Sequence, residues 1–379
     1  MHPSQNLVQV GARGRIGFVL PISPDGPNLS PQHAKTLDDE FFLSNPLAYF
    51  SSRIAALLDA QHSATQPSAE STAAFFEVLS LSRTDGVFTF NERDRGMQVA
   101  VDALALRHHV AEGIVRFLYA LAVAQPNGAE APCTWLAVAN SPMSLADTVS
   151  KVHEAFEANS TLFQSLLFRP DMNVGPSELK AAETALAWLN HSVKLLTSNE
   201  LAVNAANNKV KHGLAVSARD DVRIELVITP PDENGNIPVS AFGEGKSIPI
   251  FDRPMLSFLS HPGNKRALGL ELTALRVDVP SVLAETWMIA VTYAALFHVA
   301  ALKHFDGDEA AGFASYPRLP VGPLPDQILK GKVNGYRGVV TTPATPGVDP
   351  RPAGVFFHDF FWPMNIDFGS KVTAAVVDG

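Results

Sequence analysis

The chain has 379 residues, enough for one large domain or two of medium size. Apolar residues make up 46% and charged residues 18% of the sequence, so the chain can bury a sizeable core. Its net charge of −9 argues against nucleic-acid binding through a broad basic face. The single cysteine, Cys133, excludes an internal disulfide and a cysteine-based zinc site, and it suits a reducing cytoplasm.

The N-terminus lacks the basic-then-apolar order of a signal peptide. One segment, Leu283–Leu302, approaches the length of a membrane span. It contains Glu285 and His298, so we interpret it as a buried core helix. We therefore expect a cytoplasmic protein without membrane contact, and we predict no metal and no cofactor.

The first part of the chain mixes strand and helix signals. Residues 7–20 alternate around glycines and predict a strand pair or one irregular strand, and Pro46–His62 predicts a helix. Residues 63–71 are small and polar, as in a linker. Residues 75–90 are ambiguous: they fit a helix followed by a strand at 87–90.

The clearest predicted helix is Asp94–Ala124. Apolar residues occupy most of its surface, so it should be buried on most sides. Arg107 and His108 project into that apolar side. A buried arginine needs a carboxylate or a bound anion, and both partners fit the pattern. His108 fits a core histidine.

One narrow polar stripe runs along the same predicted helix. Two acids, a histidine and an arginine on one face could perform general acid–base chemistry. Glu112 and Arg116 are also spaced as an ordinary ion pair on a solvated face. The stripe consists of Gln98, Asp102, His109, Glu112, Arg116 and Tyr119.

Two further helices are predicted from their caps. Ser144 should cap a helix that runs to about Ala158. Ser177 should cap the next, which runs from Glu178 towards Thr197. Beyond Thr197 the chain either bends at Ser198-Asn199 or continues as a helix to His212.

In the middle of the chain, the residue pattern becomes typical of β-strands. Residues 222–229, 237–242, 247–251 and 268–279 predict an antiparallel meander of about four strands, with a hairpin turn at Asn234-Gly235. Ser281 should then cap the last long helix, to about His304.

From residue 307 onwards no helical period is found, and proline and glycine are dense. Aromatic runs in this segment indicate that it wraps a body, its own or a neighbour's. The expected fold is α+β and mainly α: a helical bundle with a small antiparallel meander and a long irregular Pro/Gly-rich C-terminal segment. We divide it into an N-terminal segment (1–92), a bundle with an inserted sheet (93–306, sheet 222–279) and the C-terminal wrap (307–379).

Amides and cations crowd together at Asn207–Gly213, near the end of a predicted helix. Lys209, Lys211 and His212 before Gly213 would also suit an ordinary helix C-terminus, where cations meet the negative end of the dipole. That explanation leaves out the asparagines, which are poor helix formers. A helix end, a binding or catalytic site and an interface all fit this stretch.

This Asn-x-Lys-x-Lys-His-Gly stretch, preceded by an Arg-His-rich helix, resembles the helical HEPN superfamily and kindred uncharacterised bacterial proteins. The resembling parts are roughly residues 94–124, 177–213 and 281–304. In ribonucleases of that superfamily, an arginine and a nearby histidine act on the RNA backbone, usually across a dimer. Asn207 or Asn208 stands at the arginine position in this chain.

The leading hypothesis is a HEPN-like protein that binds RNA or another phosphate-bearing ligand and forms a homo-oligomer. His212 and Arg107 would be its catalytic pair if it cleaves the ligand. The ligand-binding candidates are Asn204, Asn208, Lys209, Lys211, His109 and Arg116. Two alternatives stay open: a non-enzymatic assembly protein that oligomerises through its C-terminal arm, and a metabolic enzyme with an unfamiliar site.

Overall fold

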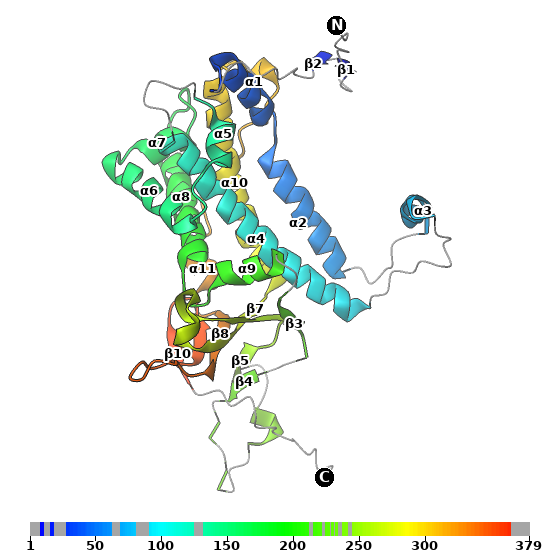
Figure 1. Ribbon diagram of the computed structural model, residues 1–379, viewed down its shortest axis with the longest axis vertical. Coiled ribbons are helices and arrows are strands. Elements are labelled where there is room, and N and C mark those ends of the chain that lie inside the picture. The colour runs from blue at the N-terminus through cyan, green and yellow to red at the C-terminus, as the bar shows by residue number, and fades with distance from the viewer. Residues whose placement is uncertain are drawn as a thin grey trace.

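The computed structural model describes residues 8–10, 16–18, 28–62, 69–80, 91–124, 132–211, 215–221, 224–227, 229–230, 232–233, 237–241 and 245–364. Its upper part is a bundle of long helices and its lower part is an antiparallel sheet (Figure 1). The chain is therefore α+β and mainly α, as the sequence predicts.

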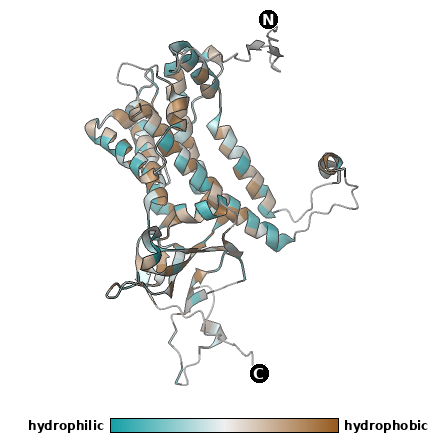
Figure 2. Ribbon diagram, viewed as in Figure 1, coloured by the Kyte–Doolittle hydropathy of each residue, from teal (hydrophilic) through white to brown (hydrophobic). Residues whose placement is uncertain are grey.

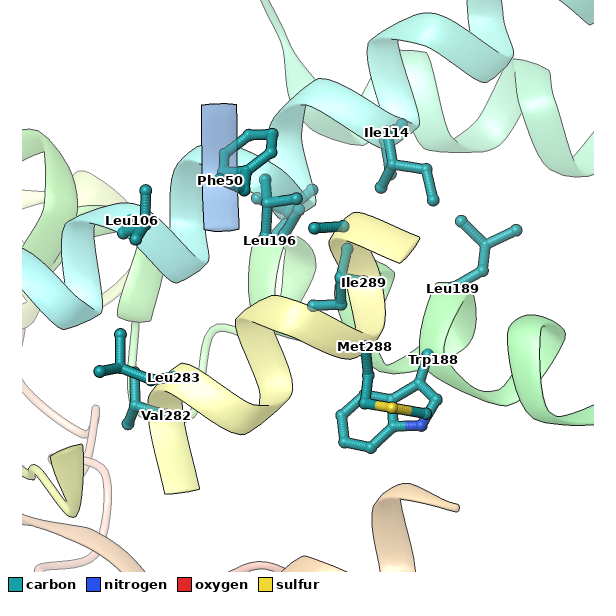
Figure 3. Packing of buried hydrophobic residues seen from close by; sticks show 14 of the residues in the cluster. Phe50, Leu106, Ile114, Trp188, Leu189, Leu196, Val282, Leu283, Met288 and Ile289 are labelled. Atoms are coloured by element: carbon teal, nitrogen blue, oxygen red, sulfur yellow. The ribbon is translucent and has the colours of Figure 1, made fainter. Parts of the chain in front are cut away.

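Two long helices form the centre of the bundle. Helix α4 (Glu92–Ala122) lies alongside α10 (Val279–His304), and α2 (Pro46–His62) and α8 (Pro176–Thr197) pack on this pair (Figure 1). Figure 3 shows side chains of α4, α8 and α10, such as Leu106, Trp188 and Ile289, meeting around α10. Removing this apolar surface from water is the main stabilising contribution to the bundle.

Helix α10 is long and apolar enough to cross a membrane by length and composition. In the folded chain, however, 83% of its most apolar window is buried inside the protein. Neighbouring helices surround it, so the prediction of a buried core helix is confirmed.

Shorter helices cover the outside of the bundle. In Figure 2, helix α6 mixes hydrophilic and hydrophobic residues, as expected for a helix with one face in water. Its cap is the predicted one, because the Ser144 hydroxyl accepts a hydrogen bond from the Asp147 amide. The shorter helices are α1 (Pro31–Phe42), α3 (Ala69–Val78), α5 (Thr134–Ala139), α6 (Leu145–Ala158) and α7 (Leu162–Leu167).

Two predicted caps are wrong. Helix α8 begins at Pro176 after Gly175, whose amide donates to the Glu178 carboxylate, so Ser177 is not its cap. Helix α10 begins after Asp278, to which the Ser281 hydroxyl donates. In both helices a proline in the first turn moves the start towards the N-terminus, because proline suits that position.

The main sheet has six strands in the order β10-β9-β8-β7-β6-β3, and all neighbours are antiparallel. Its outer strand β3 approaches α4 and its strand β6 approaches α9, so the sheet lies below the bundle (Figure 1). The strands are β3 (Ser217–Arg219), β6 (Met255–Ser260), β7 (Leu270–Arg276), β8 (Val333–Thr341), β9 (Gly354–Phe357) and β10 (Phe361–Pro363).

Two strand pairs are not hydrogen-bonded to this sheet. Strands β1 (Val8–Val10) and β2 (Ile16–Phe18) form the pair predicted near the N-terminus. Strands β4 (Ile224–Val227) and β5 (Ser247–Phe251) form the other. The strand predicted at 237–242 is instead a 3₁₀ turn at Val239–Ala241. The predicted turn Asn234-Gly235 and strand 87–90 lie outside the described residues.

The C-terminal segment first runs back along the helices. The Trp188 indole donates to the Pro323 carbonyl at 2.9 Å, and the Tyr316 hydroxyl donates to the Leu167 carbonyl at 2.8 Å. After a short helix, α11 (Pro325–Leu329), the chain enters the sheet as β8, β9 and β10. The segment expected to be irregular from residue 307 therefore builds half of the main sheet.

Candidate functional site

The chain bends between the two helices that carry most candidate residues. Helix α8 ends at Thr197, and α9 (Val203–Lys211) begins after Ala202, whose φ is 47°. Of the two predicted alternatives, the chain therefore bends at Ser198-Asn199 and does not continue as one helix. Because α9 turns away from α8, one face of α9 and the preceding link form the wall of a cavity.

We call this cavity, with a volume of about 550 Å³, the amide pocket. It lies between α9 and the turn that joins β6 to β7. Its polar side chains are Ser198, Asn199, Asn204, Asn208, Lys209, Ser260, His261, Arg266 and Arg351. Among the described residues that line it, none is an aspartate or a glutamate.

The cations of the amide pocket differ in what holds them. Arg351 forms an ion pair with the buried Glu271 and donates to the Asn199 carbonyl at 3.0 Å. His261 uses its Nδ1 on the Gly269 carbonyl. Within the described residues, Lys209 and Arg266 have no ion pair, so their charges are open to a ligand.

Three other candidates, Arg116, Lys211 and His109, lie close to Glu112 on α4. The Glu112 carboxylate accepts from Arg116 at 2.8 Å and lies 3.7 Å from the Lys211 ammonium. Arg116 also donates to the Ser141 hydroxyl, which ties α4 to the segment before α6. His109 packs edge-on against Tyr49 and Phe50. This cluster is internally paired.

The pKa values of this cluster follow burial and pairing. Burial alone would raise the pKa of Glu112, but Arg116 and Lys211 hold it below its usual value. Burial lowers the pKa of His108 to about 4, and the Glu112 carboxylate only partly offsets that effect. His108 is therefore neutral at physiological pH, as a core histidine is expected to be.

Arg107, predicted to act with His212, does not line the amide pocket. Its Nη1 donates to both carboxylate oxygens of Glu285 at 3.1 and 3.0 Å. The same carboxylate contacts His191 Nε2 at 2.8 Å. The predicted partner His212 lies outside the described residues, as do Gly213 and Leu214.

His191 was not a candidate in the sequence, yet it connects this buried network to a second cavity. We call this cavity, with a volume of about 580 Å³, the phenylalanine pocket, because Phe356, Phe357, Phe360 and Phe361 line it. Arg351 and Ser198 line both cavities, so the two lie side by side. The sequence did contain a signal for the Arg107–Glu285 pair, although not for His191. Both residues are charged and lie in apolar helices, and buried charges occur in pairs.

Asn207 differs from Asn204 and Asn208 because its side chain is buried and does not line the amide pocket. It is 6% exposed, and its amide nitrogen and oxygen find no hydrogen-bond partner within the described residues. It lies among Leu104, Leu256 and Leu275. The asparagines of α9 are therefore split between the amide pocket and the interface with α4 and the sheet.

No family model, curated protein or solved structure matches the chain. Among the residues that the structure describes, no group of three or more His, Cys, Asp or Glu side chains could hold a metal ion. The assignment of function therefore depends on the geometry of the two pockets.

Proposed function

We propose that the protein binds RNA or another phosphate-bearing ligand, and that the amide pocket holds the phosphate. The observation that carries the proposal is the lining of this pocket, whose described residues include Lys209, His261, Arg266 and Arg351 but no carboxylate side chain. In a chain with a net charge of −9, such a local excess of positive charge favours an anion.

The groups in the pocket match the chemistry of phosphate. Lys209 and Arg266 donate charge-assisted hydrogen bonds to phosphate oxygens, and the amides of Asn204 and Asn208 supply neutral donors. Both asparagines lie on α9, whose first turn also lines the cavity. The amino end of a helix carries partial positive charge and adds to the attraction.

The resemblance of residues 207–213 to HEPN proteins supports RNA as the source of the phosphate. The size of the pocket favours recognition of one or two phosphate groups over a long duplex. The sole cysteine, Cys133, is free and buried, which supports a cytoplasmic location.

Charge removal at the two unpaired cations tests the proposal. We expect the double variant Lys209→Gln/Arg266→Gln to bind a fluorescent single-stranded RNA oligonucleotide about tenfold or more weakly, because each charge-assisted hydrogen bond contributes about 1.5–3 kcal/mol. Fluorescence anisotropy measures the affinity, and parallel titrations with inorganic phosphate and AMP distinguish RNA from smaller ligands.

The matched control is Lys265→Gln. Lys265 is exposed, precedes Arg266 and does not line the pocket, so its loss removes one charge from the same loop. Equal affinities of the control and the double variant would mean that any binding is non-specific, and would refute the proposal.

A further inference from the structure

His191 joins a buried ion pair to an open, apolar cavity. Its Nε2 lies 2.8 Å from the carboxylate of Glu285, whose side chain is 3% exposed. Arg107, from the neighbouring helix α4, holds the same carboxylate through its Nη1. Three helices thus contribute one residue each to a chain of contacts that ends at the phenylalanine pocket.

The charge of Glu285 decides which nitrogen of His191 carries the proton. Burial alone would raise the pKa of Glu285, but Arg107 and His191 together hold it below its usual value. An ionised carboxylate only accepts hydrogen bonds, so Nε2 of His191 must donate. In the neutral ring Nδ1 then has a free lone pair, and it has no hydrogen-bond partner within the described residues.

Four phenylalanines line the phenylalanine pocket in two packed pairs, so a flat ligand ring would stack on the outer face of a pair, and Arg337 lies over the rings of Phe356 and Phe361. The rings of Phe357 and Phe360 are stacked with centroids 4.3 Å apart, and those of Phe356 and Phe361 lie 4.5 Å apart. All four residues line the cavity. Aromatic walls with a few convergent polar groups are typical of sites for small aromatic ligands.

One cation of this pocket is open to a ligand. Lys194 lies three residues after His191, on the same face of α8, and lines the cavity without an ion pair among the described residues. The other cationic groups of the pocket have partners, and its two carboxylates, Glu200 and Asp359, are exposed. Arg337 donates to the Pro352 carbonyl and to Glu200, Arg351 pairs with Glu271, His358 contacts Asp326, and Asp359 accepts from the Gly331 amide.

We propose that the phenylalanine pocket binds a phenol, an aromatic ligand with an acidic hydroxyl group, and that His191 accepts its proton. The ligand O–H bond breaks, a new N–H bond forms at Nδ1, and the electron pair stays on the phenolate oxygen. The ammonium of Lys194 pairs with that oxygen. Glu285 stabilises the resulting imidazolium and fixes the ring orientation, so it is a positioning residue.

The probe is 4-nitrophenol, because its phenolate absorbs visible light and the neutral phenol does not. The full chain is titrated into the probe at a pH just below the probe's own pKa. We expect the phenolate absorbance to rise with protein concentration and to saturate. His191→Gln should abolish this rise, and Lys194→Met should weaken the apparent affinity about tenfold.

Glu285→Gln tests the positioning role. The probe should still displace solvent from the pocket, but the ratio of phenolate to phenol absorbance at saturation should fall, because the imidazolium loses its carboxylate. A residue that only stabilised the fold would leave this ratio unchanged in the folded variant. His153→Gln, an exposed histidine paired with Glu157 on α6, is the matched control and should behave as the wild type.

Circular dichroism shows which variants fold. If the buried variants at 191 and 285 do not fold, the exposed Lys194→Met variant decides alone. The inference is overturned if the wild type produces no phenolate absorbance, or if Lys194→Met and folded His191→Gln match the control. Lys209→Gln should leave the signal intact, so failure of phosphate binding and failure of this inference are distinguishable.

Discussion

At the scale of single residues, two adjacent side chains of helix α4 differ in how they are paired. Arg107 is paired with Glu285, while His108 on the adjacent position is 2% exposed and has an Nδ1 without a partner in the described part of the chain. Its Nε2 lies 3.7 Å from the Glu112 carboxylate. Neighbouring residues on one helix thus differ in charge, because a guanidinium stays charged when buried and is paired here, whereas burial favours the neutral form of an imidazole.

The state of His108 predicts how stability depends on pH. Burial lowers its pKa to about 4 in the folded chain, from an ordinary value of 6.5. As the pH falls below 6.5, His108 binds a proton in the unfolded chain but not in the folded chain. The free energy of unfolding therefore decreases until the pH reaches about 4. His108 alone should lower the free energy of unfolding by about 3 kcal/mol across this window.

Denaturant unfolding at several pH values checks this prediction. His108→Gln should show a shallower fall in unfolding free energy between pH 6.5 and 4 than the wild type, whatever its stability at neutral pH. The exposed His153→Gln should keep the wild-type slope. Identical slopes in all three proteins would mean that His108 is protonated without penalty.

At the scale of elements, the pairing of β7 with β8 joins the two halves of the sheet. Gly335 on β8 faces Leu275 in this register, and a Cβ at Gly335 would overlap the carbonyl oxygen of Ala274. Gly96 on α4 offers the opposite case, because nothing lies within 4 Å of a Cβ there. The same substitution should therefore have opposite effects in the two elements.

We expect Gly335→Ala to lower the free energy of unfolding by at least about 2 kcal/mol, because the strands must move apart. Gly96→Ala should raise it by about 0.5–1 kcal/mol, because alanine loses less conformational entropy in a helix. Urea denaturation of both variants measures the difference. A stable Gly335→Ala protein would show that the β7–β8 contact tolerates a wider spacing.

At the scale of the whole molecule, the C-terminal segment belongs to the body of its own chain. Residues Val333, Tyr336 and Val355 pack with Ile250, Phe251 and Met255 in a second, smaller core. Strand β8 separates β7 from β9 in the sheet. Without this segment, β7 would be an open edge strand over an exposed apolar surface.

Removal of residues after Phe305 is therefore expected to disrupt the sheet and cause aggregation. Size-exclusion chromatography and the binding of a hydrophobic dye would report both effects, with the full chain measured in parallel. A truncated chain that stays folded and soluble, and only becomes smaller than an oligomeric full chain, would contradict this expectation. It would instead support the alternative of an assembly arm.

The sequence determined the elements whose signals are local. The bounds of α2, α4, α6 and α10 agree with those predicted from apolar periodicity to within a few residues, and the cap of α6 is the predicted one. The composition of the stretch with Asn204, Asn208 and Lys209 likewise indicated a candidate site, because a helix that packs against other elements seldom carries a stripe of polar residues.

The tertiary structure alone decided which residues meet. Strands β7 and β8 are neighbours although α10 lies between them in the chain, and β3, with three residues, is too short to be recognised by its period. Arg107 could have faced an anion or a carboxylate, and its partner became Glu285 because α10 packs against α4. Pairing over such distances depends on where helices and strands dock, which no local pattern records.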